Sequence, residues 1–591
     1  MCTIRLSIIM CVPKEGRGMI YSFTRVKVPD LGGYVQTRNG VRYMYAYVGP
    51  RRRDAGGRSV HPSARMIGRI EKSEDGTDML MPNERYYELT GATPPEGAVM
   101  EGAGRKPASK GKAREDRAEG SVISGGYGLA ATALFVESGV FSSLLEALPF
   151  KHVRNLMGLA AYLCESQHSS FEGLGDFING KMLFISEPSF DRRRAGDLLA
   201  LLGPAARTAF YRSWIKAQAG SARHVFYDVT SFSTYSGRIV KSEFGCNRDR
   251  EQLRQINEGL FCCRETGLPL FMTTYSGSLN DAQNFKHVLM QAGNCSLSPS
   301  RCGTVLIMDG GFSKEDFCWM HLAGWKFISG VSARRLSAVR QACASWSEGA
   351  SSKDDRRAWT SGEGRYISSR IQLSLGGVDG WLVMCRDMRA RIDQLDALDE
   401  RVSKLRAELE STKRAPKDGF GIWAGSFAPA FKVAKSAGPK GFAYEEDGGW
   451  LDTETALCGC VALFTTCGDM SDQEIMKAYR AKESVEDCFD TTRNGLGDKR
   501  LHVHGGQAAE GRAFAMFVAL ILWRLIRSRT KEWQKDYGST VEGAITELEK
   551  IEFVKTAGGW RLKDAVTKRQ RDLLKVLRLD LSFMKEIESA D

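Results

Sequence analysis

Two short apolar stretches, each ending in an aspartate, constrain the fold of this 591-residue chain most strongly. The first runs from His224 to Asp228, and the second runs from Gly303 to Asp309. Both have the length and composition of buried strands, which in α/β folds deliver functional groups at their carboxyl ends. We therefore expect Asp228 and Asp309 to lie side by side at the ends of adjacent strands.

The elements around these stretches predict an α/β fold. A β-hairpin is expected over 259–275, because two apolar runs flank the turn at Glu265-Thr-Gly267. A helix is expected over 281–291, a second helix over 313–322 and a strand over 326–331. The order strand, hairpin, helix, strand, helix, strand indicates a ribonuclease-H-like core.

A third acidic residue, Glu486, stands in a stretch predicted to be one capped helix starting at Ser471. Ser471 and Glu474 have the spacing of a capping box, and Gly495 is the expected stop. The helical repeat places Glu486 near basic residues, an arrangement that fits a carboxylate holding a metal ion while its neighbours hold phosphates. The alternative is an ordinary solvated charged face.

The spacing of four residues in this stretch resembles the Y-R-E-K signature of DDE transposases of the insertion-sequence-four superfamily. The residues are Tyr479, Lys482, Glu486 and Arg493, with lysine and arginine exchanged relative to the signature. The segments Asp228-Val-Thr and Asp309-Gly-Gly-Phe resemble the first two catalytic blocks of that family. Gly310 is a departure, since the resemblance implies an arginine there in much of the family. The similarity covers about residues 227–525.

The resemblance implies that Asp228, Asp309 and Glu486 are the catalytic residues and bind Mg²⁺, for which Mn²⁺ can substitute. Phosphoryl transfer with two such ions needs hard oxygen ligands, which carboxylates supply. The implied reaction is cut-and-paste transposition, in which hydrolysis frees a 3′-hydroxyl at each transposon end and that hydroxyl attacks target DNA. Glu483, one turn before Glu486, is the main rival ligand.

The partners implied are double-stranded DNA, as terminal inverted repeats and target DNA, and a second copy of the chain in a homodimeric end complex. Tyr479, Lys482 and Arg493 are expected to contact DNA. A net charge of +12 favours a polyanionic partner. Arg51, Arg52 and Arg53 follow a predicted strand at 43–48, where they form either a DNA-contacting turn or an arginine-rich surface loop.

The cellular setting predicted is the cytoplasm, in association with DNA. Fifteen cysteines, an odd number scattered through predicted strands and helices, do not resemble a secreted disulfide framework. The longest apolar run, Phe514 to Trp523, is about half a membrane span and is predicted to be a buried helix. We therefore expect no membrane association.

The predicted fold class is α/β, with a ribonuclease-H-like catalytic core interrupted by a largely β insertion, a helical pre-domain and a small N-terminal α+β module. The insertion is expected because 176 residues separate Asp309 from Glu486, far more than a crossover needs. The predicted parts are an N-terminal module (1–101), a basic linker (102–120), a helical pre-domain (121–220), two parts of the catalytic domain (221–332 and 469–530) around the insertion (333–468), and a C-terminal helical region (531–591).

Two other functions fit the same features. One is a ribonuclease-H-fold DNA endonuclease without strand transfer, and the other is a catalytically inactive DNA-binding relative. The first differs from a transposase in whether a cleaved end is joined to new DNA. The second would bind DNA without cutting it.

Overall fold

A computed structural model of the chain divides into two compact units, residues 1–117 and 118–591. The residues that the structure describes are 19–21, 25–38, 41–47, 52–53, 59–60, 64–73, 76–92, 100–102, 119–166, 170–181, 190–237, 239–245, 252–279, 281–299, 305–347, 357–361, 364–496, 506–557 and 559–579.

The first unit is built on a five-stranded antiparallel sheet of order β2-β8-β7-β4-β3. Its strands are β2 (Val26–Lys27), β3 (Gly33–Arg38), β4 (Val41–Tyr47), β7 (Ala64–Lys72) and β8 (Asp78–Pro82). Met44, Ile67 and Leu80 lie in its small apolar core. The helix α2 (Glu84–Thr90) begins where the Asn83 side chain accepts hydrogen bonds from the first-turn amides.

The structure describes two of the three arginines that were predicted to lie on a turn in this unit. Arg52 and Arg53 form the short strand β5 (Arg52–Arg53), which pairs with β6 (Ser59–Val60). Arg51 lies outside the described residues. These two arginines therefore lie in paired strand rather than on a turn.

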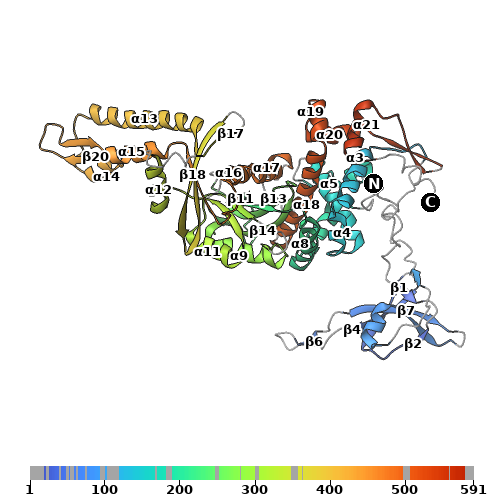
Figure 1. The fold of residues 1–591 in the computed structure, drawn as a ribbon. Coiled ribbons are helices and arrows are strands. Elements are labelled where there is room, and N and C mark those ends of the chain that lie inside the picture. Colours follow the sequence, from blue (N-terminus) through green and yellow to red (C-terminus); the bar gives the residue numbers. More distant parts are fainter. Residues whose placement is uncertain are drawn as a thin grey trace. The chain divides into compact units, whose positions relative to one another are not determined.

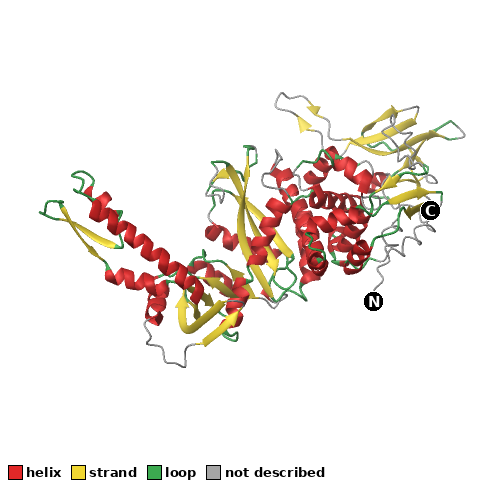
Figure 2. Ribbon diagram, turned by 90° about the horizontal axis from the view of Figure 1, so that it is seen from above, coloured by secondary structure: helices red, strands yellow, loops and turns green. Residues whose placement is uncertain are grey.

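Helices dominate the first part of the second unit and pack around α18 (Gly506–Arg529), as Figures 1 and 2 show. The others are α3 (Gly126–Glu137), α4 (Val140–Leu145), α5 (Phe150–Ser166), α6 (Leu174–Lys181), α7 (Arg192–Leu201) and α8 (Pro204–Gln218). Residues 513–523 of α18 are all buried, which confirms the predicted buried helix. Within the described residues, no helix has both the length and the apolar character needed to span a membrane.

The C-terminal region joins this helical part through a small sheet. Strand β10 (Val122–Ile123) pairs with β23 (Phe553–Thr556), which pairs with β24 (Gly559–Leu562). The helices of the region are α19 (Lys531–Asp536), α20 (Val541–Glu549) and α21 (Lys568–Val576). The region predicted as helical thus also contains two strands. They form because β23 can pair with β10, which lies some 430 residues earlier in the chain.

The centre of the second unit is a ten-stranded sheet of order β12-β13-β11-β15-β16-β22-β19-β18-β17, with β14 also paired to β13. Its first strands are β11 (His224–Thr234), β12 (Glu243–Phe244), β13 (Arg254–Cys263), β14 (Pro269–Ser276), β15 (Val305–Met308) and β16 (Lys326–Gly330). Strands β11, β15 and β16 run parallel, whereas β11, β13 and β14 are antiparallel neighbours. The helices α9 (Asp281–Asn294) and α11 (Lys314–Leu322) connect these strands, as predicted.

The segment predicted as a largely β insertion is instead mixed. Its strands β17 (Arg357–Ser361), β18 (Gly364–Leu375), β19 (Val378–Asp387) and β22 (Cys460–Thr465) extend the central sheet. Its helices are α12 (Ser337–Ser347), α13 (Met388–Ser411), α14 (Phe420–Gly425) and α15 (Gly448–Leu457). The helix α15 begins at Asp447, whose side chain accepts a hydrogen bond from the Trp450 amide at 3.1 Å and caps the first turn.

Residues 388–457, here called the arm, project from the end of the sheet (Figure 1). The arm consists of α13, α14, α15 and the hairpin of β20 (Phe431–Lys435) and β21 (Phe442–Glu446). It has its own apolar core, which includes Val402, Leu409, Phe427, Phe431 and Phe442. The leucine-rich side of α13 therefore packs within the arm.

Candidate active site

Asp228 and Asp309 occupy equivalent positions on adjacent parallel strands. The last paired residues of β11 and β15 are Tyr227 and Met308, and each aspartate is the next residue of its chain segment. Because neighbouring strands lie about 4.8 Å apart, this register places the two aspartates side by side. Asp228 is not at the end of its strand, however, since β11 continues to Thr234. The extension exists because β13 pairs with β11 along the whole of Val225–Thr234.

The two carboxylates have opposite electrostatic surroundings. Burial raises the pKa of Asp228 to about 6, against the Val229 amide hydrogen bond, and the negative charges of Asp309 and Glu486 contribute to the increase. Burial also acts on Asp309, but the Lys482 ammonium, the Gly310 amide and the Tyr479 hydroxyl outweigh it and lower its pKa. Asp309 is therefore stabilised as an anion, whereas the charge of Asp228 is costly without a further cation.

The stretch predicted as one helix is two helices, α16 (Asp472–Arg480) and α17 (Glu483–Asp490), with a turn at residues 481–482. The predicted capping box is present, since Ser471 and Glu474 bond each other's backbone amides. The helix is interrupted because its two halves are fixed to different strands of the sheet. Asp472 of α16 bonds Arg370 of β18 at 2.6 Å, whereas Cys488 of α17 lies 3.7 Å from Cys262 of β13.

The turn between the helices brings Tyr479 and Lys482 to Asp309. The Tyr479 hydroxyl donates to Asp309 Oδ1 at 2.8 Å, and Lys482 Nζ lies 2.9 Å from the same oxygen. Lys482 Nζ is also 3.9 Å from Glu486 Oε1. A single ammonium group therefore lies between two of the three predicted catalytic carboxylates.

Gly330, at the end of β16, makes room for this contact. A Cβ atom at Gly330 would lie 2.5 Å from the Tyr479 hydroxyl oxygen and 3.0 Å from the Gly310 amide nitrogen. A larger residue at position 330 would push Tyr479 away from Asp309. Sequence reasoning missed Gly330, because nothing near it in the chain signals the approach of a residue almost 150 positions later.

The donor set fits a hard divalent cation in chemistry. Asp228, Asp309 and Glu486 supply oxygen ligands only, which are the ligands that Mg²⁺ takes. The geometry is not that of a finished site, since no three acidic, histidine or cysteine side chains among the described residues gather closely enough to hold a metal ion. The side chains of Glu486 and Asp309 are similarly exposed, at 56% and 55%, but only Asp309 accepts a hydrogen bond from Tyr479.

Arg493 binds β11 two to three residues beyond Asp228. Its guanidinium donates to the Thr230 hydroxyl and, at 3.1 Å, to the Ser231 carbonyl oxygen. Thr230 is two residues after Asp228 and therefore on the same face of β11. Arg493 stands in the π-helical turn η2 (Thr491–Gly495), which ends at the predicted stop, Gly495.

For three other predicted residues, the structure describes the backbone but not the side chain. Glu483 is the first residue of α17, and its side chain lies outside the described residues. The side chains of Arg52 and Arg53 are likewise not among those described. The structure thus brings together Asp228, Asp309, Tyr479, Lys482 and Glu486, and Arg493 of η2 bonds to β11 beside Asp228.

A groove of about 550 Å³ begins at this cluster and ends against the arm. Gly310, Gly330 and Tyr479 line its inner end, and Arg401 of α13 and Glu454 of α15 line its outer end. Glu454 forms ion pairs at 3.4 Å with Arg334 and Arg340. The groove therefore connects Gly310, next to Asp309, with the base of the arm through a lining that mixes apolar and charged side chains.

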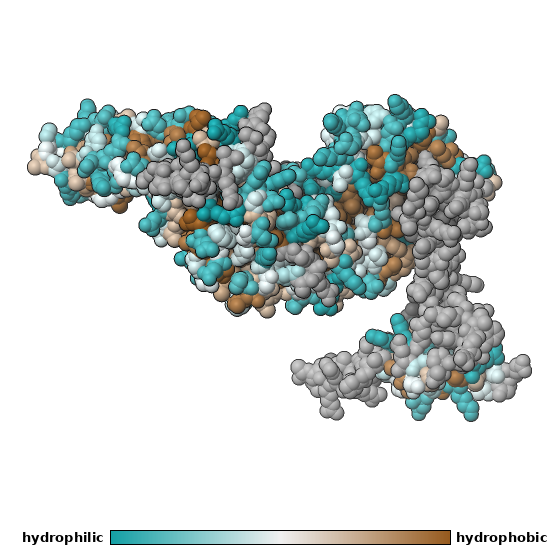
Figure 3. Space-filling view, viewed as in Figure 1, coloured by the Kyte–Doolittle hydropathy of each residue, from teal (hydrophilic) through white to brown (hydrophobic). Residues whose placement is uncertain are grey.

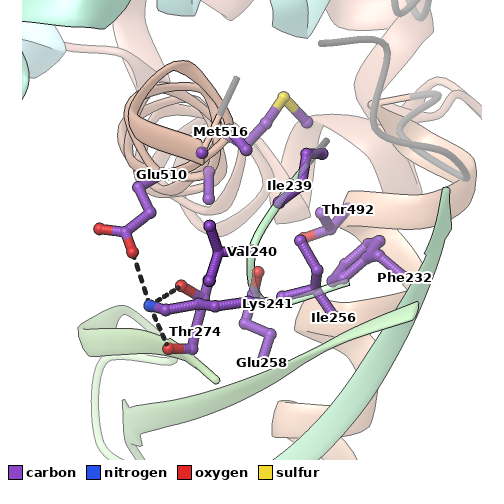
Figure 4. Close-up of a pocket in the computed structure, with 13 residues that line it drawn as sticks. Phe232, Ile239, Val240, Lys241, Ile256, Glu258, Thr274, Thr492, Glu510 and Met516 are labelled. Carbon is purple, nitrogen blue, oxygen red and sulfur yellow. Dashed lines mark hydrogen bonds and ion pairs between the residues drawn. The ribbon is translucent and has the colours of Figure 1, made fainter. Parts of the chain in front are cut away.

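A separate cavity of about 260 Å³ lies between α18 and strands β11 and β13 (Figure 4). Phe232, Ile239, Ile256 and Met516 make its walls mainly apolar. At one side Lys241 donates to Glu510 at 2.5 Å and to the Thr274 carbonyl oxygen at 2.8 Å. The Arg493 guanidinium lies 5.8 Å from the centre of the Phe232 ring. One wall of the cavity therefore also contacts Arg493.

One family model and several solved structures match this chain. The family model described as Transposase DDE domain matches residues 219–522, just over half of the chain. A cryo-EM structure of a piggyBac transposase synaptic complex with hairpin DNA matches with a TM-score of 0.32 and 9% sequence identity, over 78% of this chain and 81% of that chain. No curated protein matches the chain.

Proposed function

Because this chain belongs to the family of transposases with a DDE domain, we propose that it cuts DNA at the ends of a transposable element and joins the freed 3′-hydroxyl ends to target DNA. The observation that carries the proposal is the pair Asp228 and Asp309 at one register of two parallel strands, with Glu486 in electrostatic range of Asp228. Two adjacent carboxylates with a third in electrostatic range suit metal-assisted phosphoryl transfer, once the third moves in to complete the donor set.

Asp228, Asp309 and Glu486 are the proposed ligands for Mg²⁺ or Mn²⁺. When bound, such ions would polarise the scissile phosphate and stabilise the charge that develops on the attacking and leaving oxygens. Tyr479 fixes the orientation of Asp309 by its hydrogen bond, and Lys482 offsets the negative charge of Asp309 and Glu486. Lys482 and Arg493 are also the proposed contacts to DNA phosphates.

Two finer assignments belong to the same proposal. The run β14-β13-β11-β15-β16, antiparallel on one side of β11 and parallel on the other, supports a ribonuclease-H-like core. The spacing from Tyr479 to Arg493 supports the Y-R-E-K subgroup of the insertion-sequence-four superfamily. The proposed partners are inverted-repeat DNA, target DNA and a second copy of this chain.

The test is cleavage of a duplex that carries the inverted repeat bordering the gene, in the presence of Mg²⁺ or Mn²⁺. Asp228→Asn, Asp309→Asn and Glu486→Gln should each abolish cleavage, because each removes a charged ligand. Binding of the same duplex should be retained, since these residues repel phosphate rather than attract it. Cleavage that survives any one substitution would exclude that residue from the site.

Glu483→Gln is the matched control, since it removes the same type of carboxylate three residues earlier in α17. It should cut DNA like the unmodified protein, whereas an inactive Glu483→Gln with an active Glu486→Gln would transfer the role to Glu483. Adding a target plasmid separates transposition from simple nuclease activity. Joined products support the proposal, and cleavage without joining contradicts it.

A further inference from the structure

The charges of the arm are divided between its tip and its shaft. The tip, residues 412–441, has six cationic residues and one acid, for a net charge of +5. The rest of the arm, residues 388–411 and 442–457, has five cationic residues and eleven acids, for a net charge of −6. The arm as a whole is nearly neutral, so the separation is not a consequence of overall basic composition.

The cations of the tip are exposed and mostly without acidic partners. All six are exposed, namely Lys413, Arg414, Lys417, Lys432, Lys435 and Lys440. Among the described residues, only Lys432 has a carboxylate partner, Asp447 at 2.9 Å. Lys440 instead donates to the Glu410 carbonyl oxygen at 2.9 Å. Figure 3 shows the arm with a largely hydrophilic surface in this view.

The arm holds its tip at a fixed distance from the catalytic carboxylates. Its base is tied to α16, since Arg480 forms an ion pair at 3.1 Å with Asp387, the residue that caps α13. From that cap, the 24 residues of α13 extend about 36 Å at about 1.5 Å per residue. The apolar core of the arm links α13 to the hairpin and keeps the tip at the end of this helix.

We propose that the tip of the arm binds the phosphate backbone of duplex DNA that is also engaged at the active site. This inference rests on the proposed function. Unpaired exposed cations gain affinity for DNA by releasing counterions, whereas the acidic shaft repels the same backbone. The DNA therefore contacts the arm at the tip and spans the shaft, which requires about ten base pairs at about 3.4 Å each.

The experiment compares the unmodified full-length chain with the variant Lys413→Gln/Arg414→Gln/Lys417→Gln. The probe is the inverted-repeat duplex bordering the gene, with a flank beyond the cleavage point of either about 4 or about 20 base pairs, titrated by fluorescence anisotropy over a salt series. The variant should bind on the order of tenfold more weakly at low salt. Its slope of log affinity against log salt should fall by up to about three.

The two flank lengths identify which side of the cleavage point the tip contacts. A defect confined to the long flank places the tip on flanking DNA, and an equal defect with both flanks places it on the transposon side. Unchanged affinity and slope with both probes would overturn the proposal. If the unmodified chain itself fails to bind either probe, the proposed function fails instead of the role of the arm.

Two further variants keep the result specific to charge at the tip. Lys413→Arg/Lys417→Arg retains both charges and should bind like the unmodified chain. Asp418→Asn removes the one acid of the tip and should strengthen binding and steepen the salt slope.

A second copy of the chain is the competing partner, because its acidic shaft could pair with the tip. Light scattering that shows loss of a dimer, with DNA affinity unchanged, would overturn the proposal in favour of that partner.

Discussion

The two helices that meet at Lys482 differ in how firmly the protein holds them. In α16, the Asp472 side chain is only 2% exposed and accepts hydrogen bonds from Arg370 at 2.6 Å and Ser368 at 2.7 Å. In α17, Asp487 is 45% exposed and forms ion pairs with the half-exposed Arg527 at 3.0 Å and with the largely buried Arg524 at 3.5 Å. A side-chain cap also begins α16, whereas α17 begins without one.

The unequal anchoring of α16 and α17 indicates which side chains of the site are held in place. The firmly held helix carries Tyr479, whose hydrogen bond orients Asp309. The less constrained helix carries Glu486, whose ion pair with Lys482 spans 3.9 Å. The aspartate side of the site is therefore held by a firmly anchored helix, whereas the glutamate side lies on a helix with a more exposed anchor.

The largest effect is expected from Asp472→Asn. Removing one charge of a buried pair leaves the Arg370 guanidinium, 14% exposed, without its partner, which costs about 3 to 5 kcal/mol in the free energy of unfolding. Urea unfolding of the full chain measures the loss. Arg370→Met/Asp472→Leu removes both charges and should recover much of the stability. A loss below about 1 kcal/mol for Asp472→Asn would contradict the buried anchor.

An intermediate effect is expected from Gly330→Ala. The added methyl group meets the Tyr479 hydroxyl at 2.5 Å, and such overpacking costs about 1 to 3 kcal/mol. Cleavage should also fall by on the order of a hundredfold, because Tyr479 no longer positions Asp309. Single-turnover cleavage and urea unfolding measure the two losses.

Tyr479→Phe supplies the control for that prediction, because it removes the clashing oxygen. In the Tyr479→Phe background, Gly330→Ala should cost less stability than in the unmodified chain. Equal costs in both backgrounds would mean that the clash with the Gly310 amide nitrogen, at 3.0 Å, dominates and that Gly330 does not serve Tyr479.

The smallest effect is expected from Asp487→Asn, the same substitution in the other helix. The pair with Arg527 is partly exposed and screened by salt, and the pair with Arg524 is long at 3.5 Å, so the unfolding free energy should fall by less than about 1 kcal/mol. The loss should shrink further when salt is raised. A cost matching that of Asp472→Asn would show that the two helices are held equally firmly.

Much of the central fold could be predicted because its signals are local. The strand before Asp309, the hairpin at 259–275 and the helices at 281–291 and 313–322 all follow from periodicity and turn residues within short windows. The capping box of Ser471 and Glu474 is likewise a contact over three residues. The neighbouring positions of Asp228 and Asp309 followed from two such strands being parallel.

The mixed insertion could not be predicted from the same signals. Local patterns can mark a stretch as a strand, but no pattern within a strand specifies which edge of a sheet it joins. The addition of β18, β19 and β22 to β16 is decided by pairs such as Ser329 with Phe464, which are 135 residues apart in the chain. The helix α15 also lacks a clear local signal, because two glycines that favour a turn follow its Asp447 cap.

The sequence by itself determined the three acidic residues, their order, and the spacing from Tyr479 to Arg493, because these are properties of short segments. Only the tertiary structure decided that the helix breaks at Lys482 and that its ammonium group lies between Asp309 and Glu486. It also decided that Gly330 leaves room for the Tyr479 hydroxyl. The physical reason is that these contacts join segments held by different strands, and burial and ion pairing across the sheet, rather than any local preference, fix where each side chain lies.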